Sequence, residues 1–399
     1  MLRILKFTAA FLGVAVAIFL LVYLLNRSSF HTLFENREDL TEGSEWVEKT
    51  YSLAGLADYI HLHPDRVSIA SRVVNHPDST LMFEADTPRA MGTLSNFLLL
   101  IAYEDAFQRG EMDPSGRISW EDISRHQLPG LDHSVHDESR QFALRNEMMN
   151  GDNQDLISLE DALQLLVRFN GLALSDYLLK ALHSANLRMD DLIGRLNLDR
   201  TEAPLPFSGL YTLLAPSVQG ARADSLREKW QQASREEFEQ AVWNHSSLFI
   251  DGPQRENWLQ AMQQDRLGLT FREERDMLSL FPKTTAREMT QLLLQLYDDR
   301  LISESVSRSV KNYMRKPMEG QTAITRNFSD YGAFFDNRIG LLNGLDFGTS
   351  TYTGDTTVQA VFFDKLHIAV WFHMSSNHMH QDFQQRLIWD PALIKSMKN

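Results

Sequence analysis

The chain has 399 residues, of which 43% are hydrophobic, and a formal net charge of −14 at pH 7. This composition excludes a largely disordered protein, and the acidic balance without a long run of Lys and Arg excludes a nucleic-acid-binding surface. The chain has no cysteine, which excludes thiol catalysis, thiolate zinc sites and disulfides and is compatible with the bacterial periplasm.

An uncharged apolar stretch runs from Phe7 to Leu25 near the N-terminus. As a helix it would span about 28 Å, close to the hydrocarbon thickness of a bilayer. It ends in Leu-Val-Tyr-Leu-Leu-Asn-Arg rather than in a small-residue cleavage site, so we expect an uncleaved signal anchor over residues 1–27; the alternative is a signal peptide that is removed. Arg3 and Lys6 precede the stretch and only Arg27 directly follows it.

This charge bias predicts a cytoplasmic N-terminus and a single pass through the bacterial inner membrane, with everything after about residue 30 on the periplasmic side. Residues 28–50 are polar with scattered charges and are expected to form a stalk. The globular pattern starts at Tyr51, where helical spacing up to His61 is followed by two strand-like runs, Arg66–Val74 and Thr80–Ala85.

The middle of the chain has the periodicity of helices. Thr93–Arg109 predicts a long buried helix that stops at Gly110, and Ser158 opens another that continues to about Phe169 and is followed by a further helix through Leu182. Residues 217–282 are dense in Glu, Gln, Arg and Lys with aromatic residues at helical intervals, which predicts two or three amphipathic helices. We expect these aromatic residues to form a packed face, and the alternative is a docking face for a partner.

The last third predicts a helix over Thr284–Leu296, a hairpin of two strands, Val358–Phe363 and His367–Phe372, and a final helix from about Gln381. No internal repeat is present.

The order helix, hairpin, buried helix, helical middle, late hairpin, final helix resembles that of the class A β-lactamases and penicillin-binding serine hydrolases. Asp78–Asp86 is similar to the second strand of that family, and Thr284–Met289 is similar to the start of a late helix. The resemblance implies an α+β fold over residues 51–390, an antiparallel sheet flanked by helices plus an all-helical subdomain. Residues 217–282 would be an insertion within it, and residues 1–27 would add a transmembrane helix.

Members of this family place a Ser-x-x-Lys motif at the start of the buried helix, because acylation needs a hydroxyl whose proton can pass to a nearby base. This chain has Thr93-Leu94-Ser95-Asn96 there. The resemblance puts Thr93 at the serine position and Asn96 at the lysine position, and an amide does not accept a proton near neutral pH. Ser95 would serve only if the register of the helix shifted.

The other two family motifs are also altered. An ungapped match from Ser158 puts Asn170 at the first position of the Ser-Asp-Asn motif. The best counterpart of Lys-Thr-Gly is Asp346-Phe347-Gly348-Thr349, which replaces a cation with an anion and would repel a ligand carboxylate. These residues, Asn96, Asn170, Asp346, Gly348 and Thr349, are the predicted binding positions.

One catalytic element of the family is retained in the sequence. Leu198–Glu202 resembles the loop that carries the deacylating glutamate, so Glu202 is a candidate general base beside Thr93 or Ser95. The alternative is a solvated carboxylate on a surface loop.

Two other patterns resemble metal sites. Glu111–Asp122 resembles a calcium loop, but Arg117 and a weak ligand at position five argue against it. His373, His378 and His380, or His133 and His136, have spacings compatible with zinc. Surface histidines are the commoner explanation of such spacings, and neither a metal nor a cofactor is predicted.

The sequence therefore predicts a catalytically degenerate β-lactamase-like pseudoenzyme in the cell envelope. It would act by binding or scaffolding, with peptidoglycan fragments or an envelope protein as partners. The alternative is an active hydrolase of the β-lactamase or peptidase type that uses Thr93 or Ser95 with Glu202. A third possibility is an interaction module whose working surface is the inserted helices.

Overall fold

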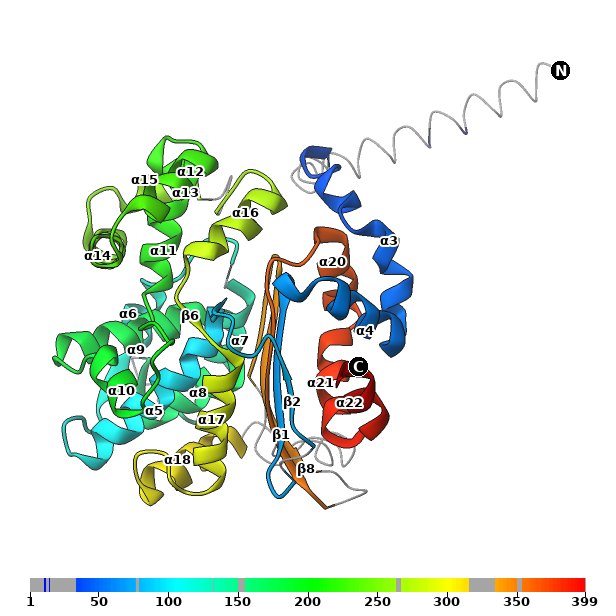
Figure 1. Cartoon of the computed structure of the whole chain (residues 1–399). Coiled ribbons are helices and arrows are strands. Elements are labelled where there is room, and N and C mark those ends of the chain that lie inside the picture. The colour runs from blue at the N-terminus through cyan, green and yellow to red at the C-terminus, as the bar shows by residue number, and fades with distance from the viewer. Residues whose placement is uncertain are drawn as a thin grey trace.

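A five-stranded antiparallel sheet in the order β2-β1-β9-β8-β7 lies at the centre of the molecule (Figure 1). The computed structural model describes residues 11, 14, 34–76, 79–131, 133–149, 155–262, 267–315, 334–349 and 354–398. Strands from the two ends of the chain meet in the sheet, where Ile69 is opposite both Phe83 and Val361. The strands are β1 (Val67–Val73), β2 (Leu81–Phe83), β7 (Phe334–Arg338), β8 (Leu341–Thr349) and β9 (Thr356–Phe363).

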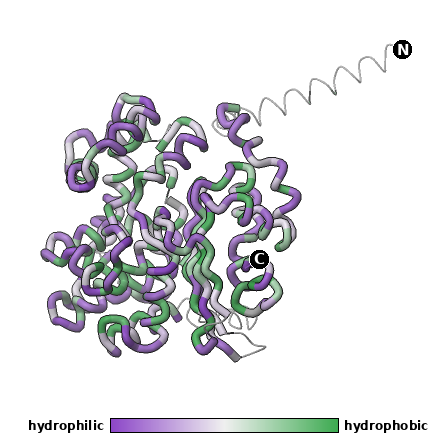
Figure 2. The backbone as a smooth tube through the Cα atoms, in the orientation of Figure 1, coloured by the Kyte–Doolittle hydropathy of each residue, from purple (hydrophilic) through white to green (hydrophobic). Residues whose placement is uncertain are grey.

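Helices cover both faces of this sheet (Figure 1). One face packs against helices from the two ends of the chain, α4 (Leu53–Leu62), α20 (Ile368–Ser376), α21 (Met379–Trp389) and α22 (Pro391–Lys398). The other packs against α5 (Ser95–Gln108), α17 (Ala286–Tyr297) and α18 (Glu304–Arg315). Because helices cover both faces, β8 and β9 are buried along nearly their whole length. Hydrophobic stretches run along the strands of the sheet (Figure 2).

Helix α5 is the centre of the all-helical subdomain. Phe97, Leu98, Leu100 and Ile101 are fully buried, and each such side chain contributes about 1.5–3 kcal/mol through the apolar surface it removes from water. Around it lie α6 (Trp120–Ser124), α7 (His133–Arg145), α8 (Leu159–Phe169), α9 (Leu172–Ser184) and α10 (Met189–Arg195). Two short two-stranded pairings complete this part of the fold. Strand β3 (Arg89–Ala90) pairs with β6 (Lys283–Thr284), and β4 (Arg117–Ser119) pairs with β5 (Leu156–Ser158).

The predicted helix after Ser158 is confirmed. The Ser158 hydroxyl accepts a hydrogen bond from the backbone N–H of Asp161 and so caps α8. The helix ends at Asn170, whose backbone is left-handed, with φ 54°. This C-cap turns the chain into α9 and fixes where the Asn170 side chain points.

The described part of the segment 217–282 is helical, as predicted, but holds more helices than the two or three expected. They are α12 (Pro216–Gln219), α13 (Ala223–Gln232), α14 (Arg235–Asp251), α15 (Arg255–Ala261), α16 (Phe271–Met277) and the short turn η6 (Leu278–Leu280), preceded by α11 (Phe207–Leu214). Helix α14 crosses α11 at Gly209, where a Cβ would lie 2.1 Å from the carbonyl oxygen of Val242. Only glycine permits this approach, which joins the inserted helices to α11 in a hydrophobic cluster of their own.

The prediction of a strand over His367–Phe372 was wrong, because these residues lie at the start of helix α20. A short, apolar and β-branched run is compatible with either a buried strand or a buried helix, and periodicity does not separate the two. The partner of β9 is instead β8, in the register Leu345 opposite Ala360.

Residues predicted to form a stalk are folded against the domain from residue 34 onward. They form η1 (Asp39–Thr41), α3 (Ser44–Val47) and η2 (Lys49–Tyr51), and the backbone carbonyl of Glu42 accepts a hydrogen bond from the N–H of Ala369 at the start of α20. Within the described residues, none of the helices has the length and apolar character needed to cross a bilayer. The predicted anchor Phe7–Leu25 lies, apart from Phe11 and Val14, outside the described residues.

Candidate functional site

Thr93 and Asn96 lie where the single turn η5 (Gly92–Leu94) leads into α5, between the sheet and the helical subdomain. Thr93 is 3% exposed and Asn96 is completely buried. Because residues three apart on a helix share a face, the two side chains point in the same direction, toward the C-cap of α8.

The Asn170 side chain joins the two. Its Nδ2 donates to the Thr93 hydroxyl at 2.6 Å and to the carbonyl oxygen of Phe335 on β7 at 3.0 Å, and its Oδ1 accepts from Asn96 Nδ2 at 2.6 Å. Asn96 Oδ1 in turn accepts from the Ser175 hydroxyl on α9 at 2.6 Å. The structure therefore brings together three predicted positions, Thr93, Asn96 and Asn170, in one network of neutral side chains.

The neighbouring strand β7 contributes a residue that the sequence did not predict. The carboxylate of Asp336, which is 4% exposed, accepts a hydrogen bond from the backbone N–H of Thr93 at 2.9 Å. Gly92 makes room for it, because a Cβ at this position, where φ is 56°, would lie 1.6 Å from Asp336 Oδ2. Glycine is therefore required here both by the backbone conformation and by the closeness of the carboxylate.

Arg338, two residues along the same strand, neutralises this carboxylate. Its guanidinium pairs with both oxygens of Asp336 and packs over the Phe207 ring, 4.9 Å from the ring centre. Burial alone would lower the pKa of Arg338, but Asp336 and Tyr211 outweigh burial and raise that pKa above its ordinary value. The pair is therefore a fixed, charged element under Thr93.

Asp346, Gly348 and Thr349 are not brought to Thr93. They lie on β8, and β7 is the strand beside Thr93. On β8 the side chain of Asn343 reaches the carbonyl of Ala90 at 2.8 Å, on the Thr93 side, whereas Gly344 contacts Gln384 of α21. Because side chains alternate along a strand, Asp346 and Gly348 face α21.

The expected correspondence with the third motif therefore does not hold geometrically. Asp346 is 2% exposed and accepts from the backbone N–H of Phe347 at 2.7 Å. Thr349 contacts the Thr356 hydroxyl at 3.1 Å, roughly 20 Å along the strand from Asn343 at 3.3 Å per residue. The residues beside Thr93 are Phe335 and Asp336, on an edge strand too short to be recognised from its sequence.

Glu202 is held away from Thr93 by other partners. Its carboxylate accepts from the backbone N–H of Lys283 at 2.9 Å and pairs with Arg235 of α14 at 3.0 Å. The backbone N–H of Glu202 donates to the carbonyl of Lys283 at 2.8 Å. In this arrangement Glu202 fastens its loop to β6 and to the inserted helices.

Ser95 is also engaged locally, since its hydroxyl donates to the carbonyl of Gly92 at 2.9 Å. This bond closes the η5 turn and directs the hydroxyl back into the turn rather than toward Asn170. As candidates for catalysis, Thr93, Ser95 and Glu202 thus occupy three separate hydrogen-bonding environments.

The histidines considered as zinc ligands have separate neighbours. The His373 ring contacts Tyr51 with the ring centres 4.1 Å apart, His380 lies 6.1 Å from the Phe335 ring, and His136 Nε2 accepts from Trp120 Nε1 at 3.1 Å. Asp113, in the calcium-like loop, accepts from the backbone N–H and hydroxyl of Ser115. Within the described ranges, no group of three or more His, Asp or Glu side chains is arranged to hold a metal ion.

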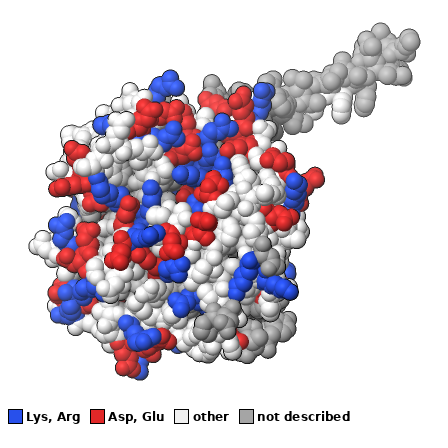
Figure 3. All heavy atoms as spheres, in the orientation of Figure 1, with Lys and Arg blue, Asp and Glu red and all other residues white. Residues whose placement is uncertain are grey.

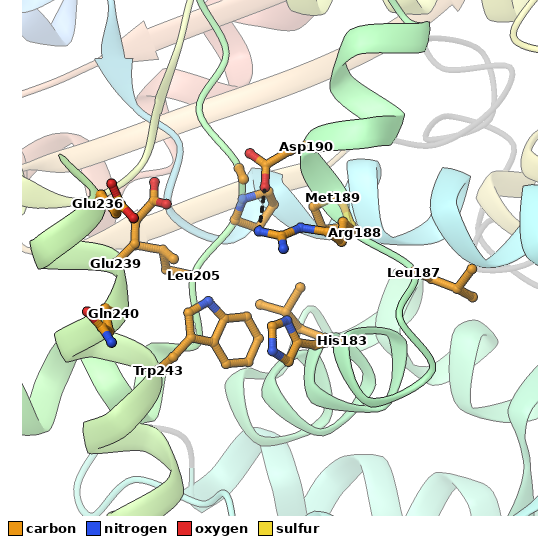
Figure 4. A pocket seen from close by; sticks show the side chains of 13 residues that line it. His183, Leu187, Arg188, Met189, Asp190, Leu205, Glu236, Glu239, Gln240 and Trp243 are labelled. Atoms are coloured by element: carbon orange, nitrogen blue, oxygen red, sulfur yellow. Dashed lines mark ion pairs between the residues drawn. The ribbon is translucent and has the colours of Figure 1, made fainter.

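A separate hollow of about 290 Å³ lies between inserted helix α14 and the α9–α10 connection (Figure 4). The indole of Trp243 and the ring of His183 stack at its wall with centroids 4.2 Å apart. Glu236 and Glu239 lie on one side, and Arg188 pairs with Asp190 at 3.9 Å on the other. On the face shown in Figure 3, basic and acidic side chains are interspersed without a large patch of one sign.

No protein-family model and no curated protein matches this chain. Solved structures similar to it include a β-lactamase from Sphaerobacter thermophilus DSM 20745, with 14% identity, a TM-score of 0.49, and coverage of 85% of this chain and 97% of that chain. A β-lactamase from Chitinophaga pinensis DSM 2588 has 14% identity, a TM-score of 0.48, and coverage of 85% and 99%. A class A β-lactamase from Bacteroides cellulosilyticus DSM 14838 has 12% identity, a TM-score of 0.46, and coverage of 87% and 97%. These similarities concern the fold alone, and they fall in the family whose likeness the sequence predicts.

Proposed function

We propose that this protein is a membrane-anchored, non-catalytic relative of the serine β-lactamases and penicillin-binding hydrolases that binds or scaffolds in the bacterial cell envelope. The observation that carries the proposal is the state of Thr93. Both its hydroxyl and its backbone N–H, the two groups that acyl transfer would need, are already bonded within the protein.

Among the described residues, no basic side chain is hydrogen-bonded to the Thr93 hydroxyl. A hydroxyl becomes nucleophilic when its proton passes to a neighbouring group with a suitable pKa. Here its neighbour Asn170 donates a hydrogen bond to it, and Asn96 occupies the position of the family lysine. Neither amide accepts a proton near neutral pH, so this network supports a structural role for Thr93.

The Thr93 backbone N–H is also unsuited to catalysis. Acyl-transfer enzymes use such an N–H to stabilise the oxyanion of the tetrahedral intermediate. In this protein Asp336 already accepts from it. An oxyanion could bind this N–H only by displacing a carboxylate that Arg338 holds in place.

The sequence supports the proposed location. The apolar stretch Phe7–Leu25 and the preceding Arg3 and Lys6 support a signal anchor with the folded domain outside the inner membrane. Peptidoglycan fragments or an envelope protein are then the partners that the family resemblance suggests. Binding would not need the acylation chemistry that the site lacks.

The first test is acylation of the full chain in membrane vesicles by a fluorescent penicillin. We expect no covalent label on protein that gives a cooperative urea unfolding transition. Thr93→Ala and Ser95→Ala are the matched variants. A covalent label that one of them removes would identify a working nucleophile, overturn the proposal and favour the active hydrolase.

A second candidate function is supported by the hollow between α14 and the α9–α10 connection. Its wall includes Trp243 of the inserted helices, so these helices offer a binding surface independent of Thr93. Deleting residues 217–282 would expose the cluster around Gly209 and unfold the domain, so a point change is the better probe. Trp243→Ala should abolish retention of an envelope partner under this hypothesis, whereas Asp336→Asn should abolish it if the partner binds at Thr93.

A further inference from the structure

Three large apolar side chains are exposed together at one end of the molecule. Phe34 is 72% exposed, Leu269 is 62% exposed and Phe372 is 36% exposed. All three are linked to Phe271. Leu269 is two residues before it, Phe372 contacts its ring, and Phe34 is two residues before Asn36, whose side chain bonds to the Phe271 backbone. Phe271 and Phe372 are 5.2 Å apart at the ring centres, and the Asn36 side chain accepts from the Phe271 backbone N–H at 2.5 Å. We refer to Phe34, Leu269 and Phe372 as the apolar patch.

The first described segment is fastened to this end. Next to the Asn36 contact, Asp39 accepts from the backbone N–H of Arg272 at 2.8 Å, and Glu42 pairs with Arg275 at 2.7 Å. Arg275 is 6% exposed. These bonds tie Asn36, Asp39 and Glu42 of the N-terminal segment to α16, so Phe34, two residues before Asn36, is held at this end of the molecule.

The length of chain before Phe34 limits how far the patch is from the predicted anchor. The apolar stretch ends at Leu25, nine residues earlier. Nine residues span at most about 30 Å when fully extended. If the stretch crosses the bilayer, α16 and the start of α20 are held close to the membrane surface, at the end of the molecule where the described chain begins (Figure 1).

We propose that the apolar patch lies in the outer interface of the lipid bilayer and orients the domain on the membrane. This inference rests on the proposed membrane anchoring. Exposed apolar groups that gather on one surface mark an interaction site, and Phe and Leu side chains on such a surface can bury themselves at the boundary between lipid headgroups and acyl chains. Because the chain has a net charge of −14, attraction to anionic lipid is not the driving force, and the patch suits a zwitterionic surface.

The absence of cysteine from the chain gives a direct test, since any introduced cysteine is unique. Leu269→Cys in the full chain is labelled with an environment-sensitive dye and reconstituted into phosphatidylcholine liposomes that contain spin-labelled lipid. Arg308→Cys is the control, because Arg308 is 68% exposed on α18 at the opposite end of the molecule (Figure 1). We expect lipid quenching at residue 269 to exceed that at residue 308 several-fold.

The outcomes separate the two proposals. Protein that floats with the liposomes but shows equal quenching at both positions would overturn the lipid-facing patch and leave the anchor intact. Protein that does not float with the liposomes would overturn the anchor and the patch together. A probe at residue 269 that is shielded both from spin-labelled lipid and from aqueous iodide would show that a protein covers the patch, which also contradicts the inference.

Discussion

The carboxylate of Asp336 accepts a hydrogen bond from the backbone N–H of Thr93 at 2.9 Å, and Thr93 occupies the nucleophile position of the family resemblance. The contact joins the edge strand of the sheet to the first turn before α5. The same carboxylate is paired with buried Arg338. Asp336 therefore links the sheet to the helical subdomain. Its carboxylate also occupies the Thr93 N–H, which catalysis would need for stabilising the oxyanion.

Asp336→Ala should destabilise the fold by about 3 kcal/mol, because it leaves Arg338 buried without its partner. Asp336→Asn should cost less, since the amide oxygen can still accept from the Thr93 N–H. Urea unfolding monitored by tryptophan fluorescence measures both. The control is Asp382→Ala, which removes an exposed ion pair with Arg386 on α21 and should change stability by less than about 1 kcal/mol. Equal losses of stability in the Asp336 and Asp382 variants would contradict the role assigned to Asp336.

Asn170 should contribute both through its side chain and through its backbone. Asn170→Gly keeps the left-handed backbone but removes the bonds to Thr93, Asn96 and Phe335, so we expect a loss of about 1–3 kcal/mol from buried groups left unpaired. Asn170→Ala should be less stable by a further ~1 kcal/mol, because φ is 54° and an alanine is strained there. If the alanine variant were as stable as the glycine variant, the backbone argument would fail.

Thr93, Asn96 and Asn170 were predicted as site positions from the family resemblance, which implies that its motifs meet at one site. The match could be made because each motif position lies at a fixed spacing within a helical segment: Thr93 and Asn96 are three apart at the start of one helix, and Asn170 follows the helix that Ser158 opens. Local periodicity of this kind is the part of a structure that a sequence specifies most directly.

Asp336 could not be predicted in the same way. Its importance comes from the position of β7 at the sheet edge, which is set by pairing with β8 between residues far from Thr93 in the chain. The family resemblance matched the third motif to Asp346–Thr349, which lies on β8, and buried strands do not reveal their order in a sheet from their composition. The helix at His367–Phe372 was missed for the related reason that its sequence suits either element.

Glu42→Ala should lower stability by about 2 kcal/mol, because the charged hydrogen bonds it makes to Arg275 are lost while the guanidinium stays buried. Glu45→Ala on the same segment, where the side chain is exposed, is the matched control and should have almost no effect. Chemical unfolding of the two variants in parallel gives the comparison. A Glu42→Ala variant as stable as Glu45→Ala would mean that the N-terminal segment is not fastened to α16 in solution.

His380 should make the folded state less stable as the pH falls. It is 1% exposed, and burial, aided by His378 and opposed by the Met374 carbonyl, lowers its pKa from 6.5 to about 4. Between those values the unfolded chain binds a proton that the folded chain does not, so stability decreases from pH 6.5 to about 4 and then levels off. One pKa unit corresponds to about 1.4 kcal/mol, so this residue accounts for up to ~3 kcal/mol. In the His380→Gln variant this position cannot titrate. The urea midpoint, measured at pH 7, 5.5 and 4.5, should therefore fall less steeply with decreasing pH in this variant than in the unaltered protein. Equal slopes of midpoint against pH would show that His380 is solvated in the native state.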